Sequence, residues 1–342
     1  MKVMLLAAGL GTRLRPVTNQ YAKPAVPFLG VPLIFWGLEL LSELNPQSVV
    51  ANLHYLPDTI RALAPRVQKS GVEIRFTHEV AAPLGSGGAL WFARKELEDS
   101  ETIVVANADE VILPLNRTTL GRMRAQHEST GALATLLTMR HAGAGTEFGA
   151  VWVDDGHGVL GFGREREKFP QATAALHYVG VIMLSTRIFK YLPDGESNLL
   201  YDAVQKGIAS GERVLAFEEK LVWFETGNPK DFLHATQELL PFISSRAEDS
   251  FASDLAQRTV ARHSDQGTRF WESHSGACLL ASNYAPGSIE ETELCRVLEN
   301  EKAFAVIGAN ALIEDSVVNS VVFPGAVVHK ASPCRDALVL ST

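Results

Sequence analysis

Residues 2–13 read KVMLLAAGLGTR. The apolar run that opens this stretch is typical of a buried β-strand, and two glycines, Gly9 and Gly11, then interrupt it. Because glycine has no Cβ, it lets the chain turn sharply and brings backbone N–H groups close to a ligand. Arg13 follows at once, and Lys23 comes ten residues later. An amide-lined turn with these cations suits a polyphosphate better than a neutral ligand.

Strand-like and helix-like segments alternate from this stretch to about residue 140. Such alternation predicts βαβ units and a mostly parallel sheet, in which ligands bind at the carboxyl ends of the strands. The strands are expected at 2–8, 48–54, 72–79, 102–109 and 132–140, and the helices at 32–44, 58–70, 85–99 and 116–128.

After residue 140 the sequence pattern changes twice, first to short strands and later to a repeat of apolar residues. Short strands separated by Gly turns fill 148–225, and a helix is expected at 228–243, with Asn228 as its cap. After residue 305, Ile307 and Ile313 are six residues apart, which favours coils of a parallel β-helix. A small β-meander is the alternative. We therefore expect three segments, namely a nucleotide-binding domain at 1–243, an irregular linker at 244–304 with one short helix at 292–301, and a C-terminal unit at 305–342.

The composition and charge of the chain argue against some classes of function. The chain has 342 residues with 46% hydrophobic and 20% charged residues, as in soluble globular proteins, and a net charge of −8. An acidic protein lacks the basic field that nucleic-acid binding requires, so nucleic acid is not an expected partner. Three late cysteines, odd in number and without metal-ligand spacing, indicate free thiols in the cytoplasm. The first apolar run is too short to span a membrane, and no membrane association is expected.

The glycine-rich loop and the KPAVPFLGVPLI segment that starts at Lys23 resemble the N-terminal motif of the sugar-1-phosphate nucleotidylyltransferases, or NDP-sugar pyrophosphorylases. The resemblance implies an α/β fold: a Rossmann-like nucleotidyltransferase domain with a mixed, mostly parallel sheet, followed by a short left-handed β-helix-like unit. It implies a reaction that joins an NTP to a sugar 1-phosphate and releases pyrophosphate. In that family the loop holds the triphosphate, which assigns this role to Ala8, Gly9, Gly11, Thr12, Arg13 and Lys23.

Further stretches resemble other parts of the family pattern. The stretch EVAAPLGSGGAL at 79–90 is similar to the segment that approaches the base, which implies base contacts at Gly85 and Gly88. A tight turn that opens a helix is the alternative. Asp109, at the end of the expected strand at 102–109, corresponds to a ligand of Mg²⁺, an ion that prefers carboxylate and phosphate oxygens. Its alternative role is to cap the turn that follows.

The segment at 147–170 resembles the sugar-phosphate region of the family. This implies that Gly149 approaches the sugar ring, Glu167 binds hydroxyls, and Lys168 meets the phosphate, although REREK alone also fits a solvated charged turn. Gly180 is similarly placed on the sugar side.

The stretch VWFETGNPKDF at 222–232 resembles the segment that carries the second metal ligand of the family. Glu225 stands where the family has Asp, so it keeps the charge but reaches one methylene further. We expect Glu225 to be the second ligand of Mg²⁺, with capping of the loop before the next helix as the alternative.

The catalytic group is therefore expected to comprise Arg13, Lys23, Asp109 and Lys168. Mannose 1-phosphate with GTP is the preferred substrate pair, because the layout of a catalytic domain followed by a short β-helix resembles the mannose-1-phosphate guanylyltransferases. N-acetylmuramate 1-phosphate with UTP, and glucose 1-phosphate with UTP or dTTP, remain alternatives. A catalytically weak sugar-nucleotide sensor is a hypothesis of another class, favoured by Glu225 and Ala108. The C-terminal unit is expected to serve assembly of a homo-oligomer.

Overall fold

The structure is a computed structural model that describes residues 1–69, 71–244, 250–264, 268–272, 277–280, 288–301 and 303–341. The parts of the expected linker that fall between these ranges lie outside the described residues. The chain divides into two compact units, Met1–Leu10 with Gly37–Trp223 and Gly11–Trp36 with Phe224–Thr342. The three-segment division expected from the sequence stays a prediction.

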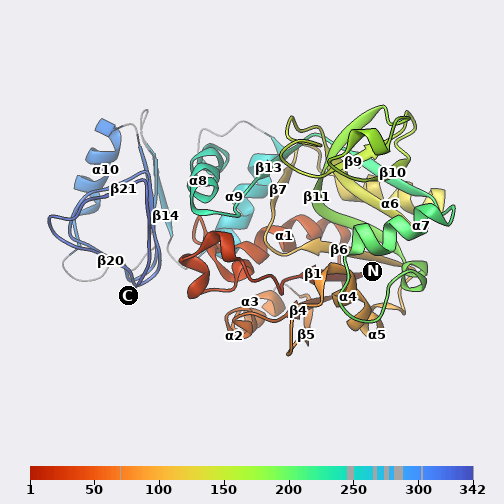
Figure 1. Cartoon of the computed structure of the whole chain (residues 1–342). Helices are drawn as coiled ribbons and strands as arrows, with labels where there is room; N and C mark the ends of the chain where they lie inside the picture. The colour runs from red at the N-terminus through yellow and green to blue at the C-terminus, as the bar shows by residue number, and fades with distance from the viewer. Residues whose placement is uncertain are drawn as a thin grey trace. The chain divides into compact units, whose positions relative to one another are not determined.

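The first unit is organised around a nine-stranded sheet (Figure 1). Four neighbouring strands in the order β6-β1-β4-β5 run parallel, with Leu5 opposite both Ala51 of β4 and Ala106 of β6. Their nearly continuous apolar sequences fit burial on both faces. This confirms the predicted parallel core. The bounds are β1 (Lys2–Leu6), β4 (Ser48–Leu53), β5 (Glu73–His78) and β6 (Thr102–Asn107).

A long antiparallel strand, β11 (Ala174–Ser185), extends this parallel core. It pairs with β6, β8 and β9, and the antiparallel pair β9–β10 forms one edge of the sheet. On the other branch, β12 runs parallel to β8. A separate two-stranded sheet joins β7 to β13. The bounds are β7 (Val111–Pro114), β8 (Ala134–Met139), β9 (Ala150–Val153), β10 (Val159–Gly163), β12 (Val214–Glu218) and β13 (Leu221–Phe224).

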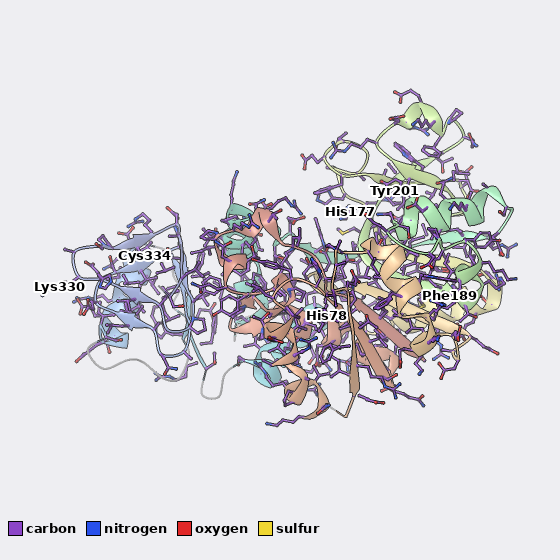
Figure 2. All side chains as sticks on the ribbon, turned by 60° about the horizontal axis from the view of Figure 1, so that its bottom comes forward. His78, His177, Phe189, Tyr201, Lys330 and Cys334 are labelled. Atoms are coloured by element: carbon purple, nitrogen blue, oxygen red, sulfur yellow. The ribbon has the colours of Figure 1, made fainter. Side chains whose placement is uncertain are left out.

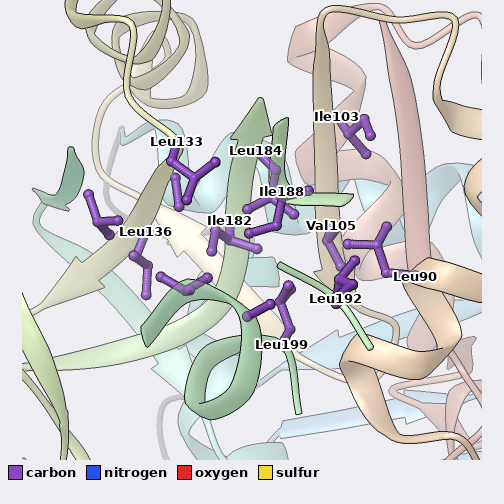
Figure 3. Packing of buried hydrophobic residues seen from close by; sticks show 14 of the residues in the cluster. Leu90, Ile103, Val105, Leu133, Leu136, Ile182, Leu184, Ile188, Leu192 and Leu199 are labelled. Carbon is purple, nitrogen blue, oxygen red and sulfur yellow. The ribbon is translucent and has the colours of Figure 1, made fainter. Parts of the chain in front are cut away.

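Helices of the first unit pack on this sheet through apolar side chains. Figure 3 shows Leu90 of α4 beside Val105 of β6, and Leu199 close to Ile182 of β11, within one buried cluster. Burial of each such side chain contributes roughly 1.5–3 kcal/mol. The helices are α1 (Leu33–Leu41), at whose middle the two units divide, and α2 (Pro57–Arg61), α3 (Ala64–Lys69), α4 (Gly85–Phe92), α5 (Arg94–Leu97), α6 (Thr119–Thr130) and α7 (Gln205–Ala209).

The second unit begins with turns and the hairpin β2 (Pro27–Phe28) and β3 (Val31–Pro32). Its longest helix, α8 (Pro229–Ile243), begins as predicted, because the Asn228 side chain accepts a hydrogen bond from the Asp231 N–H at 3.0 Å. Phe232 of α8 packs at 5.2 Å from the Phe28 ring. A further helix, α9 (Phe251–His263), follows in a region where the sequence predicted no helix.

Among the described residues, the C-terminal strands from β15 onward pair in parallel within three separate sheets. The ladders pair Val306 with Val321, Leu312 with Val327, and Val317 with Cys334. Both Ile307 and Ile313 lie in the apolar core of this region, which confirms a β-helix-like unit. The elements are β14 (Arg269–Glu272), β15 (Ala277–Leu280), α10 (Glu291–Glu301), β16 (Phe304–Ile307), β17 (Leu312–Ile313), β18 (Val317–Val318), β19 (Ser320–Val322), β20 (Val327–Val328), β21 (Cys334–Arg335) and β22 (Leu338–Val339).

No helix within the described ranges is both long enough and apolar enough to cross a membrane.

Candidate active site

The glycine-rich loop leaves β1 at its carboxyl end, as expected. Ala8 is buried, whereas Gly9 is exposed, and a Cβ built at Gly9 would meet no atom within 4 Å. Gly11 adopts a φ of 61° and opens a short 3-10 turn over Thr12–Leu14. The Thr18 hydroxyl donates to the Gly11 carbonyl at 2.8 Å. The loop therefore has open space at its first glycine and a required left-handed turn at its second.

Two cations follow the turn in the second unit. The Arg13 side chain is 72% exposed, and its Nη2 lies 4.0 Å from Oε1 of Glu225. A Cβ at Gly227 would lie 2.2 Å from that carboxylate oxygen, so glycine there leaves room for the pair. Lys23 lies next to the turn, since a Cβ added at Gly11 would lie 3.3 Å from the Cβ of Lys23. The structure thus brings together Gly11, Arg13, Lys23 and Glu225 within one unit.

Asp109 is half-buried in the turn that follows β6. Its neighbour Glu110 accepts hydrogen bonds from Asn107 Nδ2 at 3.3 Å and from Trp223 Nε1 at 2.8 Å. Gly180 lies against the same turn, because a Cβ there would be 2.8 Å from Asn107 Nδ2. The first unit therefore places Gly180 beside the segment that carries Asp109.

The stretch that leads to Gly85 is held by a buried carboxylate. Glu79 is only 3% exposed, and it accepts from Asn52 Nδ2 and from the Leu84 N–H, each at 2.7 Å. Asn52 in turn accepts from the Ala7 N–H at 2.7 Å. These bonds connect the end of β1 with the segment before Gly85, the two places from which the expected nucleotide contacts begin.

Gly85 and Gly88 themselves pack closely against protein. Gly85 has a φ of 70°, and a Cβ there would lie 2.5 Å from the Ser197 carbonyl oxygen. A Cβ at Gly88 would lie 2.2 Å from the Gly195 carbonyl oxygen. The close approach that these glycines permit is thus to the backbone of 195–197, and their contact with a base stays a prediction.

The residues expected on the sugar side come from the first unit. Gly149 is exposed, and a Cβ there would be 3.0 Å from the hydroxyl of Tyr201, which is 53% exposed on a π-helical turn. Glu167 and Lys168 are exposed on a 3-10 turn, with Lys168 Nζ 2.5 Å from a carboxylate oxygen of Glu165. This surface pair leaves Lys168 accessible to a ligand.

Four rings gather around Phe148, the residue before Gly149: His141, Phe148, His177 and Trp223. Their six centroid distances lie between 4.5 and 5.9 Å. His177 is 7% exposed, and burial, assisted by His141, lowers its pKa to about 4. Burial also raises the pKa of Tyr178, with the Glu110 charge acting in the same direction. The imidazole of His177 and the phenol of Tyr178 are therefore uncharged near neutral pH.

Sequence reasoning did not name Asn52, Glu110, His177, Tyr201 and Trp223, which lie next to the expected site residues. Each contacts a residue distant in sequence; Glu110 and Trp223, for example, are 113 residues apart. The one available signal was position, since Asn52 and Glu110 lie at or just after the carboxyl ends of parallel strands.

The role of Asp109 and Glu225 as ligands of Mg²⁺ stays a prediction. The described residues contain no cluster of three or more His, Cys, Asp or Glu side chains that could hold a metal. Mg²⁺ needs only one or two protein carboxylates when phosphates and water supply the other ligands. Asp109 in the first unit and Glu225 in the second are hard oxygen donors of this kind.

Comparison with known proteins assigns the chain to a family. The profile described as nucleotidyl transferase matches residues 2–241. The chain belongs to the nucleotidyl transferase family. The match includes all of the residues expected to act on substrate: Ala8, Gly9, Gly11, Thr12, Arg13, Lys23, Gly85, Gly88, Asp109, Gly149, Glu167, Lys168, Gly180 and Glu225.

Two relatives of this chain have names that specify different substrates. A UTP–glucose-1-phosphate uridylyltransferase of Synechocystis is 29% identical over 255 residues, which cover 70% of this chain and 63% of the relative. The mannose-1-phosphate guanylyltransferase catalytic subunit beta of Dictyostelium discoideum is 27% identical over 257 residues, which cover 74% of this chain and 68% of the relative.

Solved structures agree in fold. HddC from Yersinia pseudotuberculosis, complexed with GMP-PN, has a TM-score of 0.55 at 23% identity and covers 70% of this chain and 99% of its own. UDP-glucose pyrophosphorylase from Acinetobacter baumanii has a TM-score of 0.60 at 18% identity, and the match covers 76% of this chain and 98% of that protein. The predicted Rossmann-like nucleotidyltransferase fold is confirmed.

Proposed function

We propose that the protein transfers a nucleotidyl group from an NTP to a sugar 1-phosphate and releases pyrophosphate. The family match over 2–241 carries this proposal, because it contains the glycine-rich loop, both cations that follow it and both carboxylates. Mannose 1-phosphate and GTP are the proposed substrates, and the cytoplasm is the proposed location.

The reaction needs no general base. An oxygen of the sugar phosphate, already an anion, attacks the α-phosphorus of the NTP in line. A new bond forms from that oxygen to the α-phosphorus, and the bond from the α-phosphorus to the bridging oxygen of the β-phosphate breaks. Pyrophosphate leaves with the electron pair. The protein must therefore position two polyanions and offset their mutual repulsion.

The cations of the site are suited to this task. Arg13 is largely exposed beside the Gly11 turn, and Lys23 adjoins the same turn, where both can meet the triphosphate. Lys168, also exposed, is proposed to bind the phosphate of the sugar. Bound Mg²⁺, held by Asp109 and Glu225, would supply further positive charge to the phosphates.

Glucose 1-phosphate with UTP is the second candidate pair, favoured by the Synechocystis relative. N-acetylmuramate 1-phosphate with UTP, and glucose 1-phosphate with dTTP, stay predictions from the sequence. A catalytically weak sensor is the competing function, and the specific observation behind it is Glu225, whose carboxylate lies toward Arg13.

The test combines magnesium, five NTPs and a panel of sugar 1-phosphates, with pyrophosphate as the readout. We expect release with one pair, and Asp109→Asn or Lys23→Ala to lower turnover by on the order of 10²–10³. Asp155→Asn, which alters an exposed turn, is the control and should keep wild-type turnover. Silence across the panel with nucleotide-sugar binding retained would support the sensor, whereas a fully active Asp109→Asn would contradict the assigned site.

A further inference from the structure

His177 is a buried side chain whose polar atoms are unused. Both ring nitrogens are sealed from solvent, and among the described residues neither has a hydrogen-bond partner (Figure 2 labels the residue). A buried polar group without a partner costs free energy, whereas a phenylalanine of similar shape would not incur that cost. The described protein atoms thus leave both hydrogen-bonding positions of the ring open to a partner from outside the protein.

His127 provides the contrast. It is also buried, at 3% exposed, and burial lowers its pKa to about 4, as for His177. Its Nδ1, however, lies 2.9 Å from the Thr135 hydroxyl, so its polar atom is used within the folded protein. The unused nitrogens of His177 are thus not a general property of buried histidines in this chain.

The surroundings of His177 point to the sugar side of the site. Its ring lies 4.8 Å from Phe148, which directly precedes Gly149, and 4.5 Å from Trp223. Trp223 donates to Glu110, whose Cγ would lie 3.0 Å from a Cβ at Gly180. The ring cluster therefore joins the segments that carry Gly149 and Gly180, the two glycines expected to approach the sugar.

Two of the four rings come from a loop without regular ladders. His141 and Phe148 lie in the turns at 140–149, whereas His177 belongs to β11 and Trp223 to β13. The Gly143 N–H donates to His141 Nδ1 at 3.0 Å, which fixes His141 within its own turn. Phe148 is half-buried and precedes the exposed Gly149, and its backbone is hydrogen-bonded to Gly143 and Gly145 at 2.9 and 3.0 Å. Its phenyl ring, unlike the rings of His141 and Trp223, makes no hydrogen bond, so it is the ring of the cluster that can rotate without breaking one.

We propose that His177 is a specificity residue whose imidazole donates to or accepts from a hydroxyl of the sugar 1-phosphate once the Phe148 ring moves aside. This inference rests on the proposed function and adds a residue for the sugar of that same reaction. A neutral imidazole carries one donor and one acceptor, which is what a sugar hydroxyl can satisfy. The free-energy cost of leaving the two nitrogens without hydrogen bonds is then offset only when the sugar is bound.

The decisive variant is His177→Phe, with His127→Phe as its matched control. Because His177→Phe removes the orphaned atoms, we expect Tm of the unliganded protein to rise by about 2 °C or more. We expect the KM for the sugar 1-phosphate to rise about tenfold, the size of one lost hydrogen bond, and the KM for the NTP to change less than twofold. His127→Phe should lower Tm and leave both KM values unchanged. A purely structural role cannot combine a higher Tm with a weaker sugar interaction.

A second measurement uses the wild-type chain and does not depend on a variant. The ¹⁵N signals of the His177 imidazole should shift when mannose 1-phosphate, or glucose 1-phosphate, is added, and should not shift with GTP or UTP alone. A lower Tm for His177→Phe would show a partner, such as a trapped water, in the free protein and would overturn the inference.

An unchanged sugar KM or unmoved ¹⁵N signals would also overturn it. These results are separable from failure of the proposed function, because an active wild type with an unchanged variant refutes only the role of His177. A wild type that neither turns over nor binds any sugar 1-phosphate refutes both.

Discussion

Gly9 and Gly88 belong to two glycine-rich stretches of the first unit, and their surroundings are opposite. A side chain at Gly9 would enter open space, whereas one at Gly88 would collide with the Gly195 backbone at 2.2 Å. Both stretches resemble parts of a nucleotide-binding pattern, but only the first has a glycine, Gly9, with open space around it, since a Cβ at Gly11 would lie 2.9 Å from Thr18. A glycine in such a pattern can therefore serve packing between protein segments as well as approach to a ligand.

The largest effect is expected for Gly88→Ala. The added methyl must displace backbone, which no side-chain rotation can relieve, so we expect a loss of about 3 kcal/mol in unfolding free energy. Urea denaturation measures it. Gly156→Ala is the control, because its Cβ would make only an ordinary 3.4 Å contact with Asp154. A Gly88→Ala protein of wild-type stability would remove the contrast between the two stretches.

Glu79→Gln is expected to cost about 2 kcal/mol, because the amide cannot accept from both the Leu84 N–H and Asn52. The same denaturation experiment measures this loss. Glu98→Gln, at an exposed position, serves as the comparison and should change stability by less than about 0.5 kcal/mol. Equal stability of the two variants would mean that the buried carboxylate does not anchor the second stretch.

Gly9→Ala should leave the unfolding free energy within about 0.5 kcal/mol of wild type, because the methyl has room. If the triphosphate approaches the backbone here, the KM for the NTP should rise about tenfold, equivalent to about 1.4 kcal/mol. Steady-state pyrophosphate release measures this. An unchanged KM would show that the open space at Gly9 is not used by the nucleotide.

The smallest effect concerns Arg13 and Glu225, the ion pair of the loop. The atoms are 4.0 Å apart and the Arg13 side chain is largely exposed, so Glu225→Gln should change unfolding free energy by less than about 0.5 kcal/mol. A loss above about 2 kcal/mol would show that this loop is held as firmly as residues 85–88. Turnover of the same variant separately tests the proposed metal role.

Sequence reasoning succeeded where local chemistry decides the outcome. The cap of α8 at Asn228 depends on neighbouring residues alone, and the apolar run of β1 is sufficient to mark a buried strand. The β-helix-like unit was also recognisable, since the spacing of Ile307 and Ile313 reflects its regular coil.

Sequence reasoning failed where a helix buries mainly small residues, or where a side chain is held by a partner far away in the sequence. The buried face of α9 includes Ala252, Ala256 and Thr259, which give a weak apolar pattern among polar neighbours. The two oxygens of Glu110 are occupied by Asn107 and Trp223, and the latter contact exists only after the chain has folded. The expected site residues were chosen from local motifs, and so they omitted the side chains that hold those motifs in position.

The irregularity at Gly180 divides β11 into two functional halves. Between Tyr178 and Ile182 the pairing with β8 changes register. The first residues of the strand, Ala174–Leu176, pair with β9, and its last residues, Val181–Ser185, pair with β6. A bulge of this kind bends the strand and increases its local twist. We therefore expect the amide protons on either side of Gly180 to exchange with solvent as separate groups.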